Sequence, residues 1–158
     1  MLKTKIAVFV SGGGTNFEAL INAQENGKIP HGEIVLMVSS SKTAYALKRA
    51  ENHGIKSVVC SKKELGSQES FEEEILKNLE ENDIQLIVLA GFMSILSKEF
   101  TKKYENRIIN IHPSLIPSFC GEGFYGLHVH EAALKKGVKV TGCLLYTSPS
   151  PRDYAASR

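Results

Sequence analysis

Short runs of β-branched and aliphatic residues alternate along this chain with stretches whose apolar residues recur every three or four positions. The runs are apolar almost throughout, as is typical of parallel strands covered by helices on both faces, and they comprise residues 5–10, 34–38, 57–60, 85–89 and 107–111. The stretches between them have apolar residues at positions 17, 20 and 21, at 44, 47 and 50, and at 71, 75, 76 and 79. This series predicts an α/β fold with a doubly wound, mostly parallel sheet, and ligands bound where its strands end.

Composition narrows the class of protein. The 158 residues have room for one domain, and 42% apolar with 23% charged residues is typical of a folded globular chain. Basic residues number 19 against 17 acidic ones and are spread along the sequence, so nucleic acid is not an expected partner. No apolar run approaches the roughly 18–20 residues of a membrane span, and no signal peptide precedes the first strand. Three scattered cysteines without a C-x-x-C pair favour a reducing, cytoplasmic location.

The last fifteen residues, 144–158, differ from the rest of the chain. They show no sustained period of 2 or 3.6, and they contain Pro149 and Pro151, which cannot donate to a strand ladder or a helix interior. A series of strands and helices would continue after residues 138–141. We therefore predict an α/β domain over residues 1–143, incomplete at its C-terminal end, followed by an unstructured tail over residues 144–158.

A glycine-rich loop lies between the first predicted strand and the first predicted helix. Residues 11–16 read Ser-Gly-Gly-Gly-Thr-Asn, and glycines at a helix start let backbone N–H groups approach a phosphate closely. Thr15 and Glu18 have the spacing of a capping box, which predicts the helix start here. No lysine follows the glycines, which excludes a nucleotide P-loop, and Phe17 stands where a dinucleotide-binding loop has its third glycine. A tight turn without a ligand is the alternative.

Asn110 and His112 follow one another at spacing two, where the fifth predicted strand ends. Side chains alternate along a strand, so we expect both to lie on the same side of the sheet. An amide N–H can stabilise a developing oxyanion, and an imidazole can transfer a proton near neutral pH, so the pair suits carbonyl chemistry. A loop histidine that only bonds the backbone is the alternative.

Residues 64–83 hold eight of the acidic residues. Phe71, Ile75 and Leu79 recur at helical spacing within this segment, so we expect its charges on the solvent face of a helix and not in an acidic binding site.

Three segments closely resemble, in order and spacing, the phosphoribosylglycinamide formyltransferase family that uses 10-formyltetrahydrofolate. They are residues 11–16, residues 89–97 with Leu-Ala-Gly-Phe-Met and Ile-Leu-Ser, and residues 110–117 with Asn-Ile-His-Pro-Ser-Leu-Ile-Pro. The resemblance extends from about residue 4 to residue 142. The third segment is shared with formyltetrahydrofolate deformylase and methionyl-tRNA formyltransferase, whereas the glycine-rich loop favours the purine-pathway family.

The resemblance implies a Rossmann-like formyltransferase fold and formyl transfer from 10-formyltetrahydrofolate, as cosubstrate, to the amine of 5-phosphoribosyl glycinamide in purine synthesis. No metal is implied. By the same resemblance, the ribose phosphate is held at Gly14, Thr15 and Asn16. The folate pocket is lined by Met93, Ser94, Ile95, Leu96 and Asn110. The catalytic residues are Asn110 and His112, with His112 as the proton donor.

The sequence departs from the family at three places. Ser94 stands where the family often has arginine, and Gln68 where it has a basic residue. An Asp-x-Gly-Pro loop that orients the family's histidine has no counterpart, and we do not transfer its role to Asp153. We therefore expect marginal stability and little activity, and a non-catalytic sugar-phosphate or nucleotide-binding module, or a deformylase, stays open.

Two further points concern metals and assembly. His128 and His130, together with His112, could be imagined as a metal site, but residues 131–134 begin a predicted helix, and we expect no metal there. The sequence does not indicate an oligomeric state.

Overall fold

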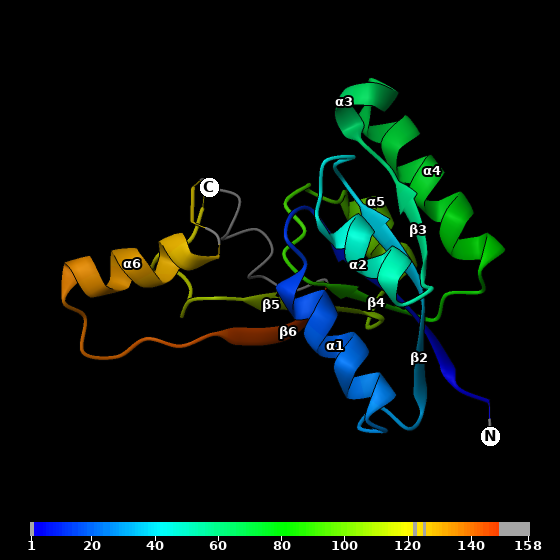
Figure 1. Ribbon diagram of the computed structural model, residues 1–158. Coiled ribbons are helices and arrows are strands. Elements are labelled where there is room, and N and C mark those ends of the chain that lie inside the picture. Colours follow the sequence, from blue (N-terminus) through cyan, green and yellow to red (C-terminus); the bar gives the residue numbers. More distant parts are fainter. Residues whose placement is uncertain (1, 122, 125, 149–158) are drawn as a thin grey trace.

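The computed structural model describes residues 2–121, 123–124 and 126–148 (Figure 1). Its strands are β1 (Thr4–Val10), β2 (Gly32–Ser39), β3 (Lys56–Val59), β4 (Leu86–Leu89), β5 (Ile108–His112) and β6 (Leu144–Ser148). Its helices are α1 (Thr15–Glu25), α2 (Ala46–Asn52), α3 (Lys62–Leu65), α4 (Gln68–Glu81), α5 (Lys98–Lys103) and α6 (Leu127–Lys136). The first five strands and helices α1, α2 and α4 are those predicted from the alternation of patterns, with small differences at their ends.

The six strands form one sheet in the order β3-β2-β1-β4-β5-β6. Strands β1 to β5 pair in parallel, and β6 pairs antiparallel with β5. The predicted doubly wound, mostly parallel α/β sheet is therefore confirmed. The chain runs outward from β1 through β2 to β3 and then returns to the other side of β1 with β4. This reversal between β1 and β4 is where open α/β sheets bind their ligands, beyond the carboxyl ends of the strands.

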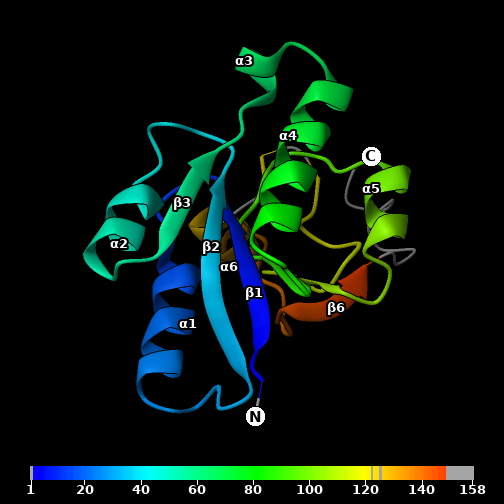
Figure 2. The ribbon, with the colours of Figure 1, turned by 90° about the vertical axis from the view of Figure 1, so that its right-hand side faces the viewer.

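Helices cover both faces of the sheet, with α1 and α2 on one side and α4 and α5 on the other (Figure 2). Side chains alternate along β1, so Val8 and Val10 enter one core while Ala7 and Phe9 enter the other. The first core includes Phe17, Ile21, Met37, Ala46 and Ala50. The second includes Phe71, Ile75, Leu79, Phe100 and Ile108. Burial on both faces explains why the strand sequences are apolar without alternation.

The prediction that residues 144–158 are unstructured is wrong for residues 144–148, which form β6. Leu144 lies opposite His112 and Tyr146 lies opposite Asn110 in the antiparallel ladder. The first proline of this segment is Pro149, so all five residues of β6 keep their N–H donors. Residues 138–141 lie between α6 and β6 and do not form a strand. Residues 149–158 lie outside the described part of the chain.

Helix α6 lies apart from the other helices at the left of Figure 1. It buries Val129 and Ala133 and ends at Gly137, whose φ of 70° is the left-handed conformation common after a helix. Across the part of the chain that the structure describes, no helix combines the length and the apolar character that crossing a membrane requires.

Candidate active site

Three hydrogen bonds join the glycine-rich loop after β1 to two neighbouring segments. Ser11 N donates to Gly91 O (3.1 Å), Ala46 N donates to Gly12 O (3.2 Å), and Arg49 Nε donates to Gly13 O (2.8 Å). These bonds hold the loop against the start of α2 and against the segment that follows β4. The protein's own hydrogen bonds therefore hold the backbone of residues 11–13 in place.

The three glycines of this loop differ in what surrounds them. Gly14 has φ 71°, and a Cβ on it would lie 2.7 Å from Ala46 Cβ, so its lack of a side chain serves packing against α2. A Cβ on Gly12 or Gly13 would meet no heavy atom within 4 Å. These two positions therefore offer open backbone of the kind that an anion can approach.

The predicted capping box between Thr15 and Glu18 is wrong. Gly14 is the N-cap of α1, Thr15 is its first residue, and no side chain bonds the N-cap backbone. The Glu18 carboxylate instead lies 3.1 Å from Arg49 Nη1 and 3.2 Å from His53 Nε2. Glu18 thus pairs with Arg49 of α2 and not with the backbone N–H of an N-cap residue. The spacing of residues along one helix cannot predict a partner from another helix.

The ion pairs beside this loop shift the pKa values of two groups. The ion pair with Arg49 is the main reason that the pKa of Glu18 is lowered. The hydrogen bonds of His53 with Glu25 (2.8 Å) and Glu18 raise the pKa of that imidazole. This network joins α1 to α2 next to the exposed side chains of Thr15 and Asn16.

The segment between β4 and α5 holds the residues predicted for the folate pocket. Its N-terminal part is tied to the glycine-rich loop, because Met93 N donates to Ser11 Oγ (2.8 Å) and that hydroxyl is 2.6 Å from Ser40 Oγ. The Met93 and Ile95 side chains are 59% and 71% exposed, whereas Ser94 and Leu96 are half-buried. The side chains of Met93 and Ile95 are therefore exposed to solvent, while the backbone that carries them is held by hydrogen bonds.

Residues of α4 hold the other end of this segment. Gln68 Nε2 donates to Ile95 O (3.0 Å), and Glu72 accepts hydrogen bonds from Ser97. Glu72 is only 8% exposed, so the expectation that all the charges of residues 64–83 lie on a solvent face is wrong for this residue. It adjoins Phe71 at the border of the buried face, and two of its three donors belong to Ser97, which is distant in sequence.

Asn110 and His112 lie at the end of β5, next to β6. Strand alternation places both on the same side as Ile108, which is buried in the core shared with α4 and α5. Asn110 Nδ2 donates to Tyr146 Oη (2.7 Å), the side chain directly opposite in the ladder. The amide carries a second N–H, so this contact leaves it one donor for a ligand.

Two polar atoms near the end of β5 are buried without a hydrogen bond in the described structure. They are His112 Nε2 and Ser114 Oγ. Burial lowers the pKa of His112 below its ordinary value, so this imidazole is neutral at neutral pH. Unpaired buried polar atoms are costly in folded proteins and are common where a ligand or reacting group binds.

The sheet brings the predicted site segments to one edge. Leu89 pairs with Phe9 on one side and with Asn110 on the other, so β1, β4 and β5 end side by side. At the usual spacing of strands, Phe9, just before the glycine-rich loop, and Asn110 are about 10 Å apart. The phosphate-loop, folate-loop and Asn/His residues predicted from the sequence therefore surround one region.

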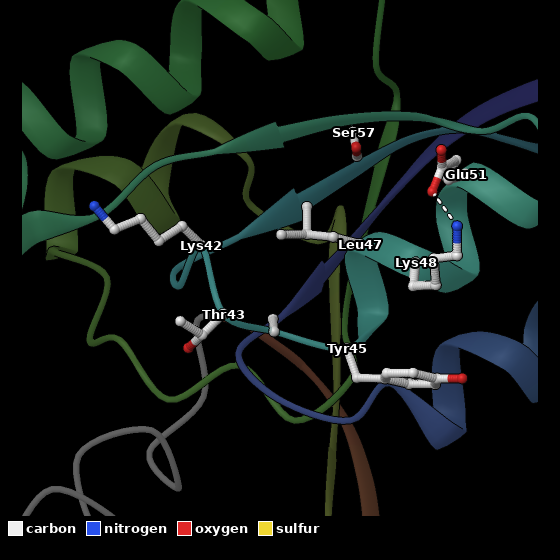
Figure 3. A pocket seen from close by; sticks show the side chains of 8 residues that line it. Lys42, Thr43, Tyr45, Leu47, Lys48, Glu51 and Ser57 are labelled. Atoms are coloured by element: carbon white, nitrogen blue, oxygen red, sulfur yellow. Dashed lines mark hydrogen bonds and ion pairs between the residues drawn. The ribbon is translucent and has the colours of Figure 1, made fainter.

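A cavity of about 580 Å³ lies elsewhere, beside α2 and β3 (Figure 3). Its lysines are paired, Lys48 with Glu51 at 2.7 Å and Lys42 with Glu64 at 2.6 Å. None of the predicted site residues lines it. Among the described residues, no group of three His, Cys, Asp or Glu side chains could hold a metal ion, and His128 Nδ1 lies 3.7 Å from Glu131 on α6.

Comparison with known proteins decides the family. The sequence profile of the family described as "Formyl transferase" matches residues 4–148. The chain belongs to the formyl transferase family. The match includes β6, in agreement with the pairing of this strand on the sheet.

Relatives of this formyl transferase chain carry names from purine biosynthesis. "Trifunctional purine biosynthetic protein adenosine-3" of Gallus gallus is 46% identical over 144 residues, covering 91% of this chain and 14% of that protein. "Phosphoribosylglycinamide formyltransferase, chloroplastic" of Vigna unguiculata is 32% identical over 140 residues, covering 89% of this chain and 45% of that protein. The chain thus spans less than half of either relative.

Solved structures have the same fold. Glycinamide ribonucleotide transformylase 1 from Geobacillus kaustophilus superposes with a TM-score of 0.83 at 34% identity, covering 94% of this chain and 76% of that one. Phosphoribosylglycinamide formyltransferase from Brucella melitensis gives a TM-score of 0.79 at 41% identity, covering 91% and 72%.

Sequence reasoning missed the side chains that hold the site loops in place. Ser11, Glu72 and Tyr146 act between segments that are 25 to 82 residues apart. Ser11 was visible as the first residue of the glycine-rich segment, but no local pattern shows its bond to Met93. Tyr146 lies within residues 144–158, where the sequence pattern predicts no strand.

Proposed function

We propose that this chain provides the substrate sites for formyl transfer from 10-formyltetrahydrofolate to the amine of 5-phosphoribosyl glycinamide, in purine synthesis. The observation that carries the proposal is the meeting of three loops at one edge of the sheet. The loops after β1, β4 and β5 are those that the family resemblance assigns to the ribose phosphate, the folate and the reacting atoms. Their strands are neighbours in the sheet.

The residues present suit these ligands. The phosphate would be held by backbone N–H groups around Gly14, Thr15 and Asn16, and the open space at Gly12 and Gly13 gives it access. The flat ring system of a folate would pack on the exposed Met93 and Ile95, beside Ser94 and Leu96. Both ligands would then extend toward Asn110 and His112.

Asn110 and His112 would supply the chemistry. The free N–H of Asn110 would stabilise the negative charge on the formyl oxygen as the amine nitrogen bonds to the formyl carbon. His112 is neutral because burial lowers its pKa, so Nε2 can accept a proton from the attacking amine. When the bond between the formyl carbon and the folate nitrogen breaks, that nitrogen takes the proton.

A sugar-phosphate-binding module without catalysis is the second candidate. It is favoured by one contact of the Asn/His pair, because an N–H of Asn110 is engaged by Tyr146 and is not available to a developing oxyanion. The third candidate is a formyltetrahydrofolate deformylase. In that reaction water attacks the formyl group in place of the amine, and formate is released.

Calorimetry and a transfer assay separate these functions. We expect the full chain to bind both 5-phosphoribosyl glycinamide and 10-formylfolate, a stable oxidised form of the cosubstrate. We expect His112→Ala to keep both affinities while lowering formyl transfer from 10-formyltetrahydrofolate by about 100-fold or more. Binding of the ribonucleotide alone would indicate the non-catalytic module, and formate release without ribonucleotide would indicate a deformylase. Equal rates of formyl transfer in wild type and His112→Ala would reject the catalytic role proposed for His112.

We also propose a cytoplasmic location, with small molecules as the partners. Cys60, Cys120 and Cys143 are free thiols in the structure. Burial raises the pKa of Cys60 to about 11, so it is uncharged and unreactive at neutral pH. Free thiols of this kind are typical of a reducing compartment.

A further inference from the structure

Glu72 is a buried carboxylate whose hydrogen bonds all stay within the protein. Its Oε1 accepts from Ser97 N and from Gln68 Nε2, both at 2.6 Å, and its Oε2 accepts from Ser97 Oγ at 2.6 Å. Burying a charge is costly unless hydrogen bonds replace its water, and bonds to a charged acceptor are the strong ones. Two of these three donors belong to Ser97, at the end of the segment that follows β4.

The contact with Ser97 completes a helix cap between two helices. Ser97 is the N-cap of α5, and its Oγ accepts from Phe100 N at 3.1 Å. In a capping box, the residue at the position of Phe100 is a Glu or Gln that accepts the N-cap backbone N–H. Phenylalanine cannot do this, and Glu72 of α4 accepts that N–H instead. The start of α5 is therefore set by α4.

Gln68 adds a second attachment one helical turn away on α4. Its amide donates to Ile95 O at 3.0 Å as well as to Glu72. With Met93 N bonded to Ser11 Oγ, residues 93–97 are anchored at both ends. The side chains of Met93 and Ile95, more than half exposed, stand between these anchors.

We propose that Glu72 and Gln68 are positioning residues, which hold residues 93–97 in the shape that binds the folate cosubstrate. The inference rests on the proposed function, because that function assigns the folate to this segment. Neither side chain contacts the glycine-rich loop in any hydrogen bond of the described structure. Loss of the Glu72 carboxylate therefore weakens folate binding and leaves ribonucleotide binding intact.

The test compares Glu72→Gln with Glu73→Gln, which removes the same charge from an exposed neighbour on α4. Hydrogen exchange followed by mass spectrometry reports the protection of residues 95–97, and calorimetry gives the affinities for 10-formylfolate and 5-phosphoribosyl glycinamide. In Glu72→Gln we expect about tenfold faster exchange and about tenfold weaker 10-formylfolate binding, the effect of losing one hydrogen bond to a charged group. The affinity of Glu72→Gln for 5-phosphoribosyl glycinamide stays within about twofold of wild type. In Glu73→Gln, the exchange rate and both affinities also stay within about twofold of wild type.

Three outcomes would overturn the inference. Unchanged exchange at residues 95–97, faster exchange with unchanged 10-formylfolate affinity, or equal weakening of both ligands would each show that Glu72 does not position this site. If the wild-type chain itself fails to bind 10-formylfolate, the proposed function falls, and the inference with it. Should Glu72→Gln not fold, Gln68→Ala keeps the carboxylate and removes only the Gln68 contacts, and the same selective weakening is required of it.

Discussion

Gly13 and Gly14 are neighbours in the loop after β1, and a side chain would meet different surroundings at the two positions. At Gly14 a methyl group would collide with Ala46, and the alanine that carries it would have to adopt a φ of 71°. At Gly13 it would project into open space, and Gly13 is not among the residues with positive φ. Gly14 is therefore required for packing within the protein, whereas Gly13 leaves room for a ligand.

Alanine at these two positions therefore should have separable effects. Gly14→Ala is expected to lower the free energy of unfolding by about 2 kcal/mol, from backbone strain and the clash with α2. Gly13→Ala is expected to keep the wild-type unfolding temperature while weakening 5-phosphoribosyl glycinamide binding about tenfold, because its methyl group occupies the approach to the backbone N–H groups. Thermal unfolding and calorimetry measure both effects. A Gly13→Ala protein with wild-type affinity would place the phosphate elsewhere.

His53 and His112 are expected to titrate on opposite sides of the ordinary imidazole value of 6.5. The hydrogen bonds to Glu25 and Glu18 raise the pKa of His53, whereas burial lowers that of His112. His53 thus stabilises the folded state at pH below 6.5, and this contribution is lost as the pH rises through its raised pKa. Protonation of His112 disfavours the folded state, so its effect appears as the pH falls below 6.5.

Titration of the imidazole resonances by NMR measures these values, with His53→Gln and His112→Gln to assign the signals. The difference in unfolding temperature between wild type and His53→Gln should shrink as the pH rises. A midpoint for His53 at or below 6.5 would contradict the ion pairs described beside α1.

At the scale of elements, β6 is the part of the sheet that the sequence did not predict. Its five residues pair with all of β5, and Tyr146 meets Asn110 across the ladder. Removing it would expose the edge of β5 and take away cross-strand pairs worth roughly 0.2–1 kcal/mol each.

A chain that stops after residue 143 is therefore expected to unfold at a lower temperature than one that stops after residue 148, by about 5 to 10 °C. Differential scanning calorimetry of the two proteins measures the difference. Identical unfolding temperatures would mean that β6 contributes nothing to the fold.

For the whole molecule, the apolar runs were sufficient to predict the five parallel strands, because apolar side chains of these strands pack into the cores on the two faces of the sheet. The edge strand β3 is mostly exposed, and only its Val58 packs against a core. They were also sufficient to predict that residues after β1, β4 and β5 share one edge. β6 was missed because it has one partner strand and lies beside two prolines, so its pairing with β5 is visible only in three dimensions. Glu72 was missed for a related reason: helical periodicity locates it near Phe71 but carries no information about Ser97.

The cap that α4 supplies to α5 also bears on the order in which the molecule folds. Helix α5 has six residues, and an isolated helix needs about 12–15 to persist in water. Its first turn lacks a local acceptor for the N-cap amide until Glu72 arrives with α4. The segment before α5 therefore becomes ordered only after α4 has docked on the sheet, and it is the first to open when that docking loosens. We therefore expect the segment proposed to bind the folate to open before the sheet does, so that partial unfolding abolishes cosubstrate binding while most of the sheet stays intact.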